Sequence, residues 1–578
     1  MFSAQDRFAS AAPARRAGAF AAPALHVLTA FRVLTAFCAL AALCALSAPA
    51  RATDAHHAMV VAENALAASA GAEILSRGGN AIDAAAATSL AVGVTNPASC
   101  GIGGGGFMLI YLARTHSFYA LDYRERAPMA ASATMYVRGG KTDEALARAG
   151  PLAVAVPGEI AGLDAALRRF GTMKFSTVAA PAIRLAEQGF PATDHMVQDI
   201  ARTSTELAAD PGLKATYLTP AGAAPKPGDI LHEKALGATL RSLGDDPVTR
   251  FYHGEIARTL AEWMKAHGGL VSAEDLAQYR PVWRAPLHRA YRGYEVWTMP
   301  PPSSGGVVLE ILGMLASAPV AGLGADSPPY LARLIEIMRQ AFIDRDRYAD
   351  PDFVHVPIDQ LLSQRHIDEA LQRALHRGAP AHLAPAADHG TSNLLVVDKD
   401  GNVVAVTTTI NTIFGAKMMV AGLGLVLNDE MDDFAAGPGV PNVFKLEGAA
   451  ANAIAPGKRP LSSMSPVIVM RRGRPVLTAG ASGGPTIISG VVQVAVNVLD
   501  FHLAPTAAVD EPRVHEQAAP DVVFVEAAMP PATRSALEQM GYRLKEVPSL
   551  GAVGAIAIAP GDLNGAFDPR KGGGAAGL

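Results

Sequence analysis

Residues 390–406 read GTSNLLVVDKDGNVVAV, and this stretch decides the fold. Two apolar runs, residues 394–397 and 403–406, flank the turn-forming residues 398–402. This pattern predicts a buried β-hairpin. Thr391 directly follows a glycine, at the point where helix-rich sequence gives way to the first strand. By itself a Gly-Thr-Ser triplet is typical of a turn, so its meaning depends on the rest of the chain.

The rest of the chain predicts a mixed α/β fold. A short strand and two helices are expected within residues 58–95, and residues 150–380 are expected to be mostly helical. A second hairpin is expected from residues 466–470 and 475–479, followed by a long apolar helix over residues 486–499. Helix-rich sequence followed by antiparallel hairpins and more helix indicates an α/β sandwich with both faces covered.

The first 52 residues differ in composition from the remainder and look like a secretory signal. An apolar run over residues 33–46, short for a membrane span, follows four arginines: Arg7, Arg15, Arg16 and Arg32. Small residues come next, so we expect cleavage after Ala50 or Ala52 and export to the periplasm or the medium. A retained N-terminal anchor is the alternative.

The composition, 50% apolar and 18% charged over 578 residues, is that of a globular protein. Removing residues 1–52 takes away five Arg and one Asp, which changes the net charge from −4 to about −8. An acidic chain without a basic stripe argues against nucleic acid or an anionic membrane surface as a partner. Cys38 and Cys44 leave with the signal, and Cys100 alone cannot form an internal disulfide.

Three further segments carry expectations. Residues 101–106 (GIGGGG) formally contain G-x-G-x-x-G, but they precede a strand-like segment, and a dinucleotide site needs the reverse order. We therefore expect these glycines to allow close backbone packing beside a site. The charged face of the helix expected over residues 330–348 should be mostly solvated. The glycine-rich tail at residues 571–577 should be loose.

Four motifs follow the hairpin of residues 394–406: TTTINT at 407–412, NDEMDDF at 428–434, RPLSSMSP at 459–466 and GASGGP at 480–485. With these motifs, the glycine-rich loop and DYRE at 122–125, the chain resembles the gamma-glutamyltransferase family of N-terminal-nucleophile hydrolases over about residues 58–570. The resemblance implies a four-layer αββα sandwich, built jointly by two chains cut from one precursor. The implied parts are a signal peptide (1–52), a helix-rich large subunit (53–390) and a small subunit (391–578) that pairs with it.

The resemblance places the cut between Gly390 and Thr391 and makes Thr391 the nucleophile. A threonine hydroxyl is weakly nucleophilic at neutral pH, and cleavage frees an α-amine of near-neutral pKa that can serve as its base. Gly390 offers little steric hindrance to attack on its carbonyl. By resemblance, Thr409 orients the Thr391 amine and hydroxyl. Gly483 and Gly484 precede a predicted helix, where free N–H groups suit a developing oxyanion.

A γ-glutamyl donor carries an α-carboxylate and an α-ammonium, so its pocket needs partners of both charges. The resemblance implies three partners for the carboxylate: Arg124, Ser462 and Ser463. It implies three partners for the ammonium: Asn411, Glu430 and Asp433. Asn411 is expected on the same strand face as Thr409. The motifs include no metal-binding or cofactor signature, so neither group is expected.

The chain departs from the family pattern in two places. After the nucleophile the family usually has Thr or Ser, then His and an aromatic residue, whereas this chain has Ser392, Asn393 and Leu394. This difference bears on the rate of processing. Many relatives have a tyrosine in the loop over the pocket where this chain has Phe444, which cannot hydrogen-bond to Asn411 through its ring. We therefore expect a more open or mobile lid.

The expected function is an exported, self-processing gamma-glutamyltransferase that cleaves glutathione and related compounds and passes the acyl group to water or to amino acid or peptide acceptors. One alternative is a related acylase, such as a cephalosporin acylase or a poly-γ-glutamate-cleaving enzyme. The other is an unprocessed protein that binds γ-glutamyl peptides without turnover.

Overall fold

The predicted hairpin lies at the centre of the molecule. The computed structural model describes residues 51–318, 320, 322–376, 390–436, 440–446, 449–518 and 522–578, so most of the predicted signal lies outside the described residues. Strand β12 (Ser392–Val397) pairs antiparallel with β13 (Val403–Thr409), and every residue of both strands is buried. Strands buried on both faces read as near-continuous apolar runs, which is why the pair was visible in the sequence.

The hairpin occupies the middle of a seven-stranded sheet. In spatial order the strands are β23 (Gly574–Gly577), β2 (Met59–Ala62), β12, β13, β3 (Gly105–Leu112), β4 (Ser117–Tyr123) and β9 (Val282–Arg284). Strands from both sides of the predicted cut are therefore hydrogen-bonded to one another within one sheet. Two chains cut at residue 390 would stay joined by these ladders.

A second seven-stranded sheet packs against the first. Its strands in spatial order are β1 (Ala52–Ala55), β22 (Asp562–Phe567), β21 (Ala552–Ala559), β17 (Arg474–Ser482), β16 (Val467–Arg471), β11 (Tyr294–Thr298) and β10 (Leu287–Tyr291). Strands β16 and β17 are the second predicted hairpin. Strands β9, β10 and β11 were not predicted, since residues 150–380 were expected to be mostly helical.

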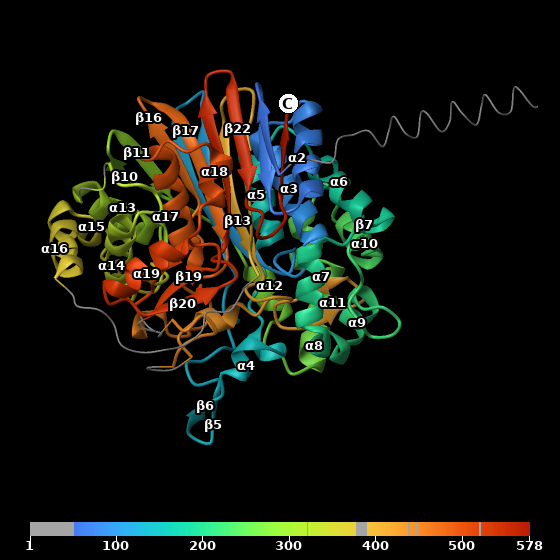
Figure 1. Cartoon of the computed structure of the whole chain (residues 1–578). Coiled ribbons are helices and arrows are strands. Elements are labelled where there is room, and N and C mark those ends of the chain that lie inside the picture. The colour runs from blue at the N-terminus through green and yellow to red at the C-terminus, as the bar shows by residue number, and fades with distance from the viewer. Residues whose placement is uncertain are drawn as a thin grey trace, which may run out of the picture. The chain divides into compact units, whose positions relative to one another are not determined.

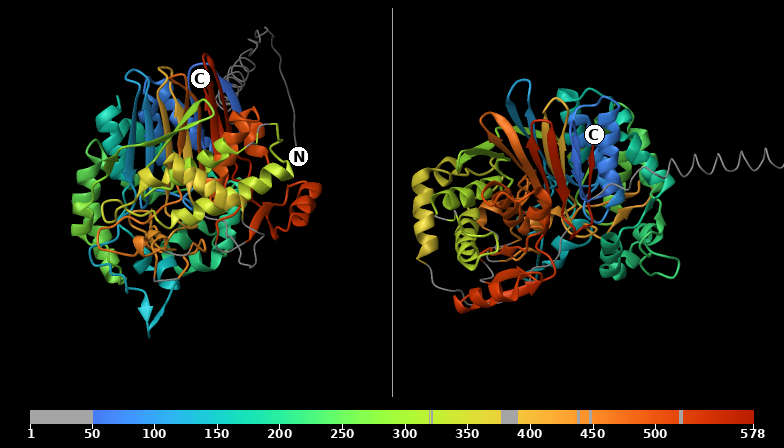
Figure 2. Two further views of the ribbon diagram at one scale, coloured as in Figure 1. Left: turned by 90° about the vertical axis from the view of Figure 1, so that its left-hand side faces the viewer. Right: turned by 45° about the horizontal axis from the view of Figure 1, so that its top comes forward.

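Helices cover the outer faces of both sheets, which gives the expected four-layer αββα sandwich (Figure 1). The first sheet is covered by α2 (Ala65–Ser76), α3 (Ala81–Thr95) and α5 (Glu159–Phe170), with α6 (Phe175–Gln188) packed on α3 and α10 (Lys234–Leu243) behind α6. The second sheet is covered by α13 (Gly305–Ser317), α17 (Thr486–Leu499) and α18 (Pro505–Asp510), with α14 (Pro328–Arg345), α16 (Gln364–Leu375) and α19 (Pro531–Gln539) farther out. Figure 2 shows the strands between the two helical layers.

Shorter elements complete the described chain. The helices are α4 (Ala145–Arg148), α7 (Asp194–Arg202), α8 (Ser204–Ala209), α9 (Pro211–Tyr217), α11 (Glu255–Ala266), α12 (Ala273–Gln278) and α15 (Ile358–Leu361). The strands are β5 (Val137–Arg138), β6 (Lys141–Thr142), β7 (Phe190–Pro191), β8 (Ile230–Leu231), β14 (Met419–Val420), β15 (Leu425–Val426), β18 (Val514–His515), β19 (Val523–Glu526) and β20 (Leu544–Val547). Within the described ranges, no helix combines the length and apolar character needed to cross a bilayer.

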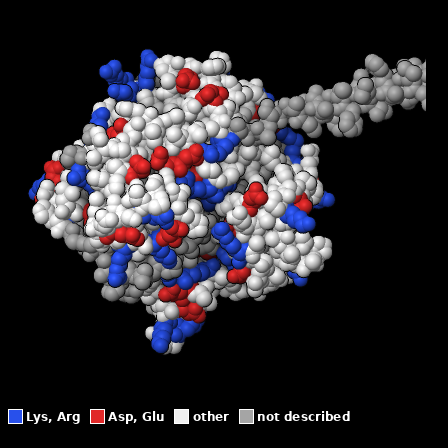
Figure 3. Space-filling model, in the orientation of Figure 1, with Lys and Arg blue, Asp and Glu red and all other residues white. Residues whose placement is uncertain are grey.

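Two expectations about the C-terminal tail and the helix over residues 330–348 were wrong. The C-terminal tail is not loose, because residues 574–577 form β23 and pair with β2 at the edge of the first sheet. The charged residues of α14 are not mostly solvated, because Arg339, Asp344 and Arg345 are all buried. Helix α14 packs against α13 and α16, so its polar face meets other helices. On the molecular face drawn in Figure 3, acidic and basic side chains are interspersed.

Candidate active site

Thr391 lies at the start of β12, with its hydroxyl buried between two partners. The hydroxyl donates to the carbonyl oxygen of Gly390 at 2.5 Å, and its oxygen lies 3.0 Å from Oγ1 of Thr409. Thr409 Oγ1 is also 3.2 Å from the Gly390 carbonyl oxygen. Both threonine side chains therefore converge on the carbonyl group at the predicted cut.

Asn411 fixes the direction of this hydrogen-bond chain. Its backbone N–H donates to Thr409 Oγ1 at 2.8 Å, which leaves the Thr409 hydroxyl hydrogen free to point at Thr391 or Gly390. The expectation that Asn411 shares a strand face with Thr409 was wrong. Strand β13 ends at Thr409, and Asn411 follows in a turn with φ of 76°. Asparagine tolerates this left-handed conformation better than most residues.

The glycine-rich loop packs against the same strand end, as predicted. A Cβ on Gly104 would lie 1.9 Å from the carbonyl oxygen of Thr409, and one on Gly106 would lie 2.3 Å from that of Thr407. Only a residue without a side chain allows this approach. Strand β3 begins inside the loop and pairs with β13, with Gly105 opposite Thr409. The loop thus fixes the position of Thr409 by direct backbone contact.

A buried ion pair borders Thr391 on its other side and was not anticipated from sequence. Lys571 Nζ donates to the carbonyl oxygen of Thr391 at 3.4 Å and lies 3.4 Å from Glu63 Oε1. Burial raises the pKa of Glu63, while Lys571 and Asn96 lower it. No local pattern marked Lys571, because it lies in the glycine-rich tail and reaches Thr391 only when β23 pairs with β2.

Arg124 organises a second cluster, to which the resemblance had assigned binding of the substrate's charged end. Its guanidinium is 1% exposed and forms ion pairs with Glu430 and Asp433, and it lies 3.6 Å from Glu125. Glu430 and Asp433 belong to a short 3₁₀ helix directly after Asp429. Asn411 joins the two clusters, because its side-chain amide donates to the Asp429 carbonyl oxygen at 3.0 Å.

The carboxyl groups of this cluster outnumber its cations. Burial raises the pKa of Glu125 to about 7, although Arg124 opposes the shift. Burial raises the pKa of Glu430 and of Asp433 as well, again against the effect of Arg124. Removing three carboxylates from water is costly unless each gains a cation or a proton. The cluster is therefore short of positive charge, which an ammonium group would supply.

Arg345 is a second buried arginine that sequence reasoning missed. It lies at the end of α14, donates from Nε to Ser304 Oγ at 3.0 Å, and donates from Nη2 to Ser463 Oγ at 3.3 Å. Burial lowers its pKa to about 10, while the nearby Asp433 carboxylate opposes the shift. The structure thus places Ser463, a predicted carboxylate-binding residue, within hydrogen-bond distance of a guanidinium group. The sequence did not indicate Arg345 as a site residue, because the charged face of its helix was expected to be mostly solvated.

The remaining predicted residues lie in three places. Ser462 is buried, and its carbonyl oxygen accepts from Ser304 Oγ at 2.6 Å. Gly483 and Gly484 lie between β17 and α17 with φ of 124° and 60°, conformations that favour glycine. Phe444 is 8% exposed, and its carbonyl oxygen accepts from Gln517 at 2.9 Å. The greater opening expected of the lid stays a prediction.

Comparisons with known proteins agree over most of the chain. The model of a family described as Gamma-glutamyltranspeptidase matches residues 67–578. A glutathione hydrolase proenzyme of Escherichia coli (strain K12) is 39% identical over 528 residues, which are 89% of this chain and 91% of the relative. A cephalosporin acylase from Bacillus halodurans has a TM-score of 0.81 at 30% identity, covering 91% of this chain and 97% of that one. A Helicobacter pylori gamma-glutamyltranspeptidase structure has a TM-score of 0.52 at 35% identity, covering 55% of this chain and 91% of that one.

Proposed function

Because the chain belongs to the gamma-glutamyltranspeptidase family, we propose that it is an exported, self-cleaving enzyme that breaks the γ-glutamyl amide bond of glutathione and related compounds. One observation carries the proposal: the buried hydroxyl of Thr391 contacts both the Gly390 carbonyl oxygen and the Thr409 hydroxyl. This arrangement suits self-cleavage first and acyl transfer afterwards.

The first step of self-cleavage uses groups that already meet at this point. Oγ1 of Thr391 attacks the carbonyl carbon of Gly390, the C–O bond forms, and the C–N bond between the two residues breaks. The hydroxyl proton ends on the released amine nitrogen. Water then hydrolyses the ester, leaving a Gly390 carboxylate and a free Thr391 hydroxyl. The Thr409 hydroxyl, 3.2 Å from the Gly390 oxygen, donates to it as negative charge develops.

The mature enzyme uses the new α-amine of Thr391 as its base. The amine takes the hydroxyl proton while the oxygen attacks the γ-carbonyl carbon of the donor, and then gives that proton to the departing amine. A γ-glutamyl ester on Thr391 remains. Water, an amino acid or a peptide attacks this ester in the second half of the cycle. The N–H groups of Gly483 and Gly484 stabilise the oxyanion in both halves.

The Arg124 cluster binds the α-amino acid end of the donor. Arg124 and Arg345 provide positive charge for the α-carboxylate, with Ser462 and Ser463 as neutral donors. Glu430, Asp433 and the Asn411 amide receive the α-ammonium. Since Arg124 is paired with Glu430 and Asp433 in the structure, a zwitterionic ligand exchanges one set of ion pairs for another and leaves no charge unpaired.

Export rests on the N-terminal composition, and the first strand supports the earlier of the two cleavage sites. Strand β1 begins at Ala52, and the Arg51 carbonyl oxygen accepts from the N–H of Phe567 at 3.0 Å. Cleavage after Ala52 would remove the Arg51 hydrogen bond and the pairing of Ala52 with Ala566 from the sheet edge, whereas cleavage after Ala50 keeps them. N-terminal sequencing of the secreted protein distinguishes the two sites.

The proposal is tested by mass spectrometry and denaturing electrophoresis of the purified protein. Two chains are expected, the smaller beginning at Thr391. Thr391→Ala should give one chain and no hydrolysis of a chromogenic γ-glutamyl anilide, while Thr391→Ser should keep some processing. An intact chain that hydrolyses glutathione at the wild-type rate would overturn the proposal. An intact chain that binds γ-glutamyl peptides without turnover would favour the binding protein.

An acylase is the second candidate, favoured by the TM-score of 0.81 with a cephalosporin acylase. Both activities would use Thr391, so processing does not separate them. The charged cluster around Arg124 suits a donor with an α-ammonium, which a glutaryl group lacks. Parallel assays with a γ-glutamyl anilide and a glutaryl amide decide the question. Preference for the glutaryl compound would assign the acylase activity, and cleavage of poly-γ-glutamate is tested beside them.

A further inference from the structure

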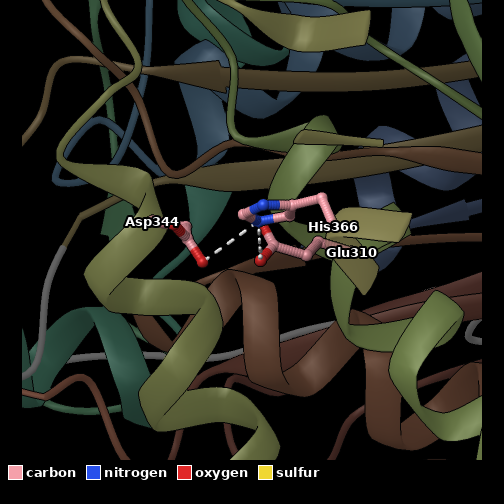
Figure 4. Close-up of side chains that lie close together, drawn as sticks. All are labelled: Glu310, Asp344 and His366. Atoms are coloured by element: carbon pink, nitrogen blue, oxygen red, sulfur yellow. Dashed lines mark ion pairs between the residues drawn. The ribbon is translucent and has the colours of Figure 1, made fainter. Parts of the chain in front are cut away.

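Three buried side chains from three different helices meet beneath the second sheet (Figure 4). Glu310 lies on α13, Asp344 on α14 and His366 on α16. His366 Nε2 is 3.6 Å from Glu310 Oε1 and 3.3 Å from Asp344 Oδ2. One potential ligand atom from each residue lies within 4.8 Å of the other two. None of these residues is part of the machinery assigned to Thr391.

The cluster is incompletely satisfied by the described protein atoms. Glu310 is 0% exposed, and neither of its carboxylate oxygens has a hydrogen-bond partner among the described residues. His366 Nε2 is likewise buried without such a partner there. A neutral imidazole with its proton on Nδ1 would point the Nε2 lone pair at two carboxylates, which is unfavourable unless a cation lies between them.

The two distances from His366 Nε2 to the carboxylate oxygens suit a tetrahedral metal site. Zinc binds histidine nitrogen and carboxylate oxygen at about 2.0–2.2 Å, so adjacent ligand atoms of a tetrahedral site lie about 3.3–3.5 Å apart. The separations of 3.3 Å and 3.6 Å at His366 Nε2 agree with this geometry. One imidazole and two carboxylates are ligands that zinc accepts, and a water can complete the set.

The surroundings hold Asp344 in position. Gln340, one turn earlier on α14, donates to Asp344 Oδ2 at 2.9 Å, as outer partners of metal ligands commonly do. Two partly exposed cations also face Asp344, with Arg373 3.6 Å from Oδ2 and Arg347 3.8 Å from Oδ1. Their positive charge balances part of the carboxylate charge from the outer side, and neither arginine forms an ion pair with Glu310 among the described residues.

We propose that Glu310, Asp344 and His366 bind one divalent zinc ion that ties α13, α14 and α16 together. The ion would fix the end of α14, where the next residue is Arg345. Sequence motifs gave no sign of this site, because its three ligands come from separate helices and no short pattern contains two of them.

The test measures metal content and does not depend on catalysis. Protein without a histidine tag is purified from zinc-supplemented medium, dialysed, and analysed for metal and protein by mass spectrometry. Wild type should hold about one zinc per chain. His366→Gln and Glu310→Gln should each lose most of it. His376→Gln, an exposed histidine just beyond the end of α16, should retain it. Cobalt reconstitution of the wild type should give the visible absorption of a tetrahedral site.

Three outcomes overturn the proposal: wild type without stoichiometric zinc that also gives no tetrahedral cobalt spectrum, zinc retained in both Gln variants, or zinc lost equally in the His376 control. The zinc content and cobalt spectrum of the wild type test the proposal without any variant, so a variant that folds poorly does not prevent the test. Wild-type protein that binds zinc but has no γ-glutamyl activity would count against the proposed function and not against the metal site.

Discussion

The backbone N–H of Asn411 donates to the hydroxyl oxygen of Thr409, while the side chain of the same asparagine donates to the carbonyl oxygen of Asp429. Asn411 therefore connects the threonine pair at the predicted cut with the segment that carries Glu430 and Asp433. The turn that contains Asn411 would therefore fix the distance between a group bound at the acidic segment and a carbonyl attacked by Thr391. Such positioning is a large part of what an acyl-transfer site must provide.

Thr409→Val should slow self-cleavage about 100-fold, because it removes the hydroxyl that lies against both Thr391 and Gly390. The appearance of the small chain in purified precursor, followed over time by electrophoresis, measures the rate. Thr407→Val is the matched control: this buried threonine lies on the same strand, and its hydroxyl has no hydrogen-bond partner among the described residues. Equal rates in the two variants would exclude a specific role for Thr409.

Gly104→Ala should prevent folding of the site or abolish processing, since the added Cβ would lie 1.9 Å from the Thr409 carbonyl oxygen. Strand β3 would have to move away from β13 to relieve the overlap. Gly422→Ala is the control, because a Cβ there meets nothing within 4 Å. Small-chain formation and the thermal unfolding midpoint report the result. Normal processing by Gly104→Ala would mean that the loop does not position Thr409.

Arg345→Lys should raise KM for a γ-glutamyl anilide about tenfold with a smaller change in kcat. Lysine cannot reproduce the two hydrogen bonds that the guanidinium makes to Ser304 and Ser463. Arg365→Lys, at a side chain that is 83% exposed, should leave both constants unchanged. A fall in kcat alone would instead assign Arg345 to the transition state.

Glu159 should make stability depend on pH. It is buried, accepts from Ser89 at 2.5 Å and from Thr408 at 2.9 Å, and burial raises its pKa from 4.5 to about 7. The folded state then binds more protons than the unfolded state between these values. Its stabilising contribution is fully present below pH 4.5 and is lost as the pH rises through about 7.

Glu159→Gln should remove that loss, which amounts to about 3 kcal/mol for a shift of this size. Urea unfolding at pH 5 and pH 8 measures it, in a Thr391→Ala background so that a single chain unfolds. We expect the difference in stability between the two pH values to shrink in the variant. An unchanged difference would show that Glu159 stays ionised in the folded protein.

Phe444→Tyr should lower the rate of reaction with bulky donors, because a hydroxyl at this position could hydrogen-bond to Asn411 and restrain the loop. Small γ-glutamyl anilides should be affected less. Steady-state kinetics with a large and a small donor provide the comparison. Identical constants for wild type and variant with the bulky donor would count against a lid controlled at residue 444.

The sequence by itself determined the central hairpin, the second hairpin and the helix after it, because strands and helices buried on all sides must be apolar along their length. It also determined the close approach of the glycine-rich loop, since four consecutive glycines have few other uses. The motifs supported the family and named Thr391, Arg124 and Asp433 as site residues.

Only the tertiary structure decided which distant groups complete each cluster. Lys571 reaches Thr391 because β23 pairs with β2, and Arg345 reaches Ser463 because α14 ends beside the RPLSSMSP segment. Glu310 and His366 meet because α13 and α16 pack together. Local patterns record the burial of an element, whereas contacts between charged side chains far apart in sequence depend on how layers and helices pack. No periodicity in the sequence indicates which layers and helices will pack together.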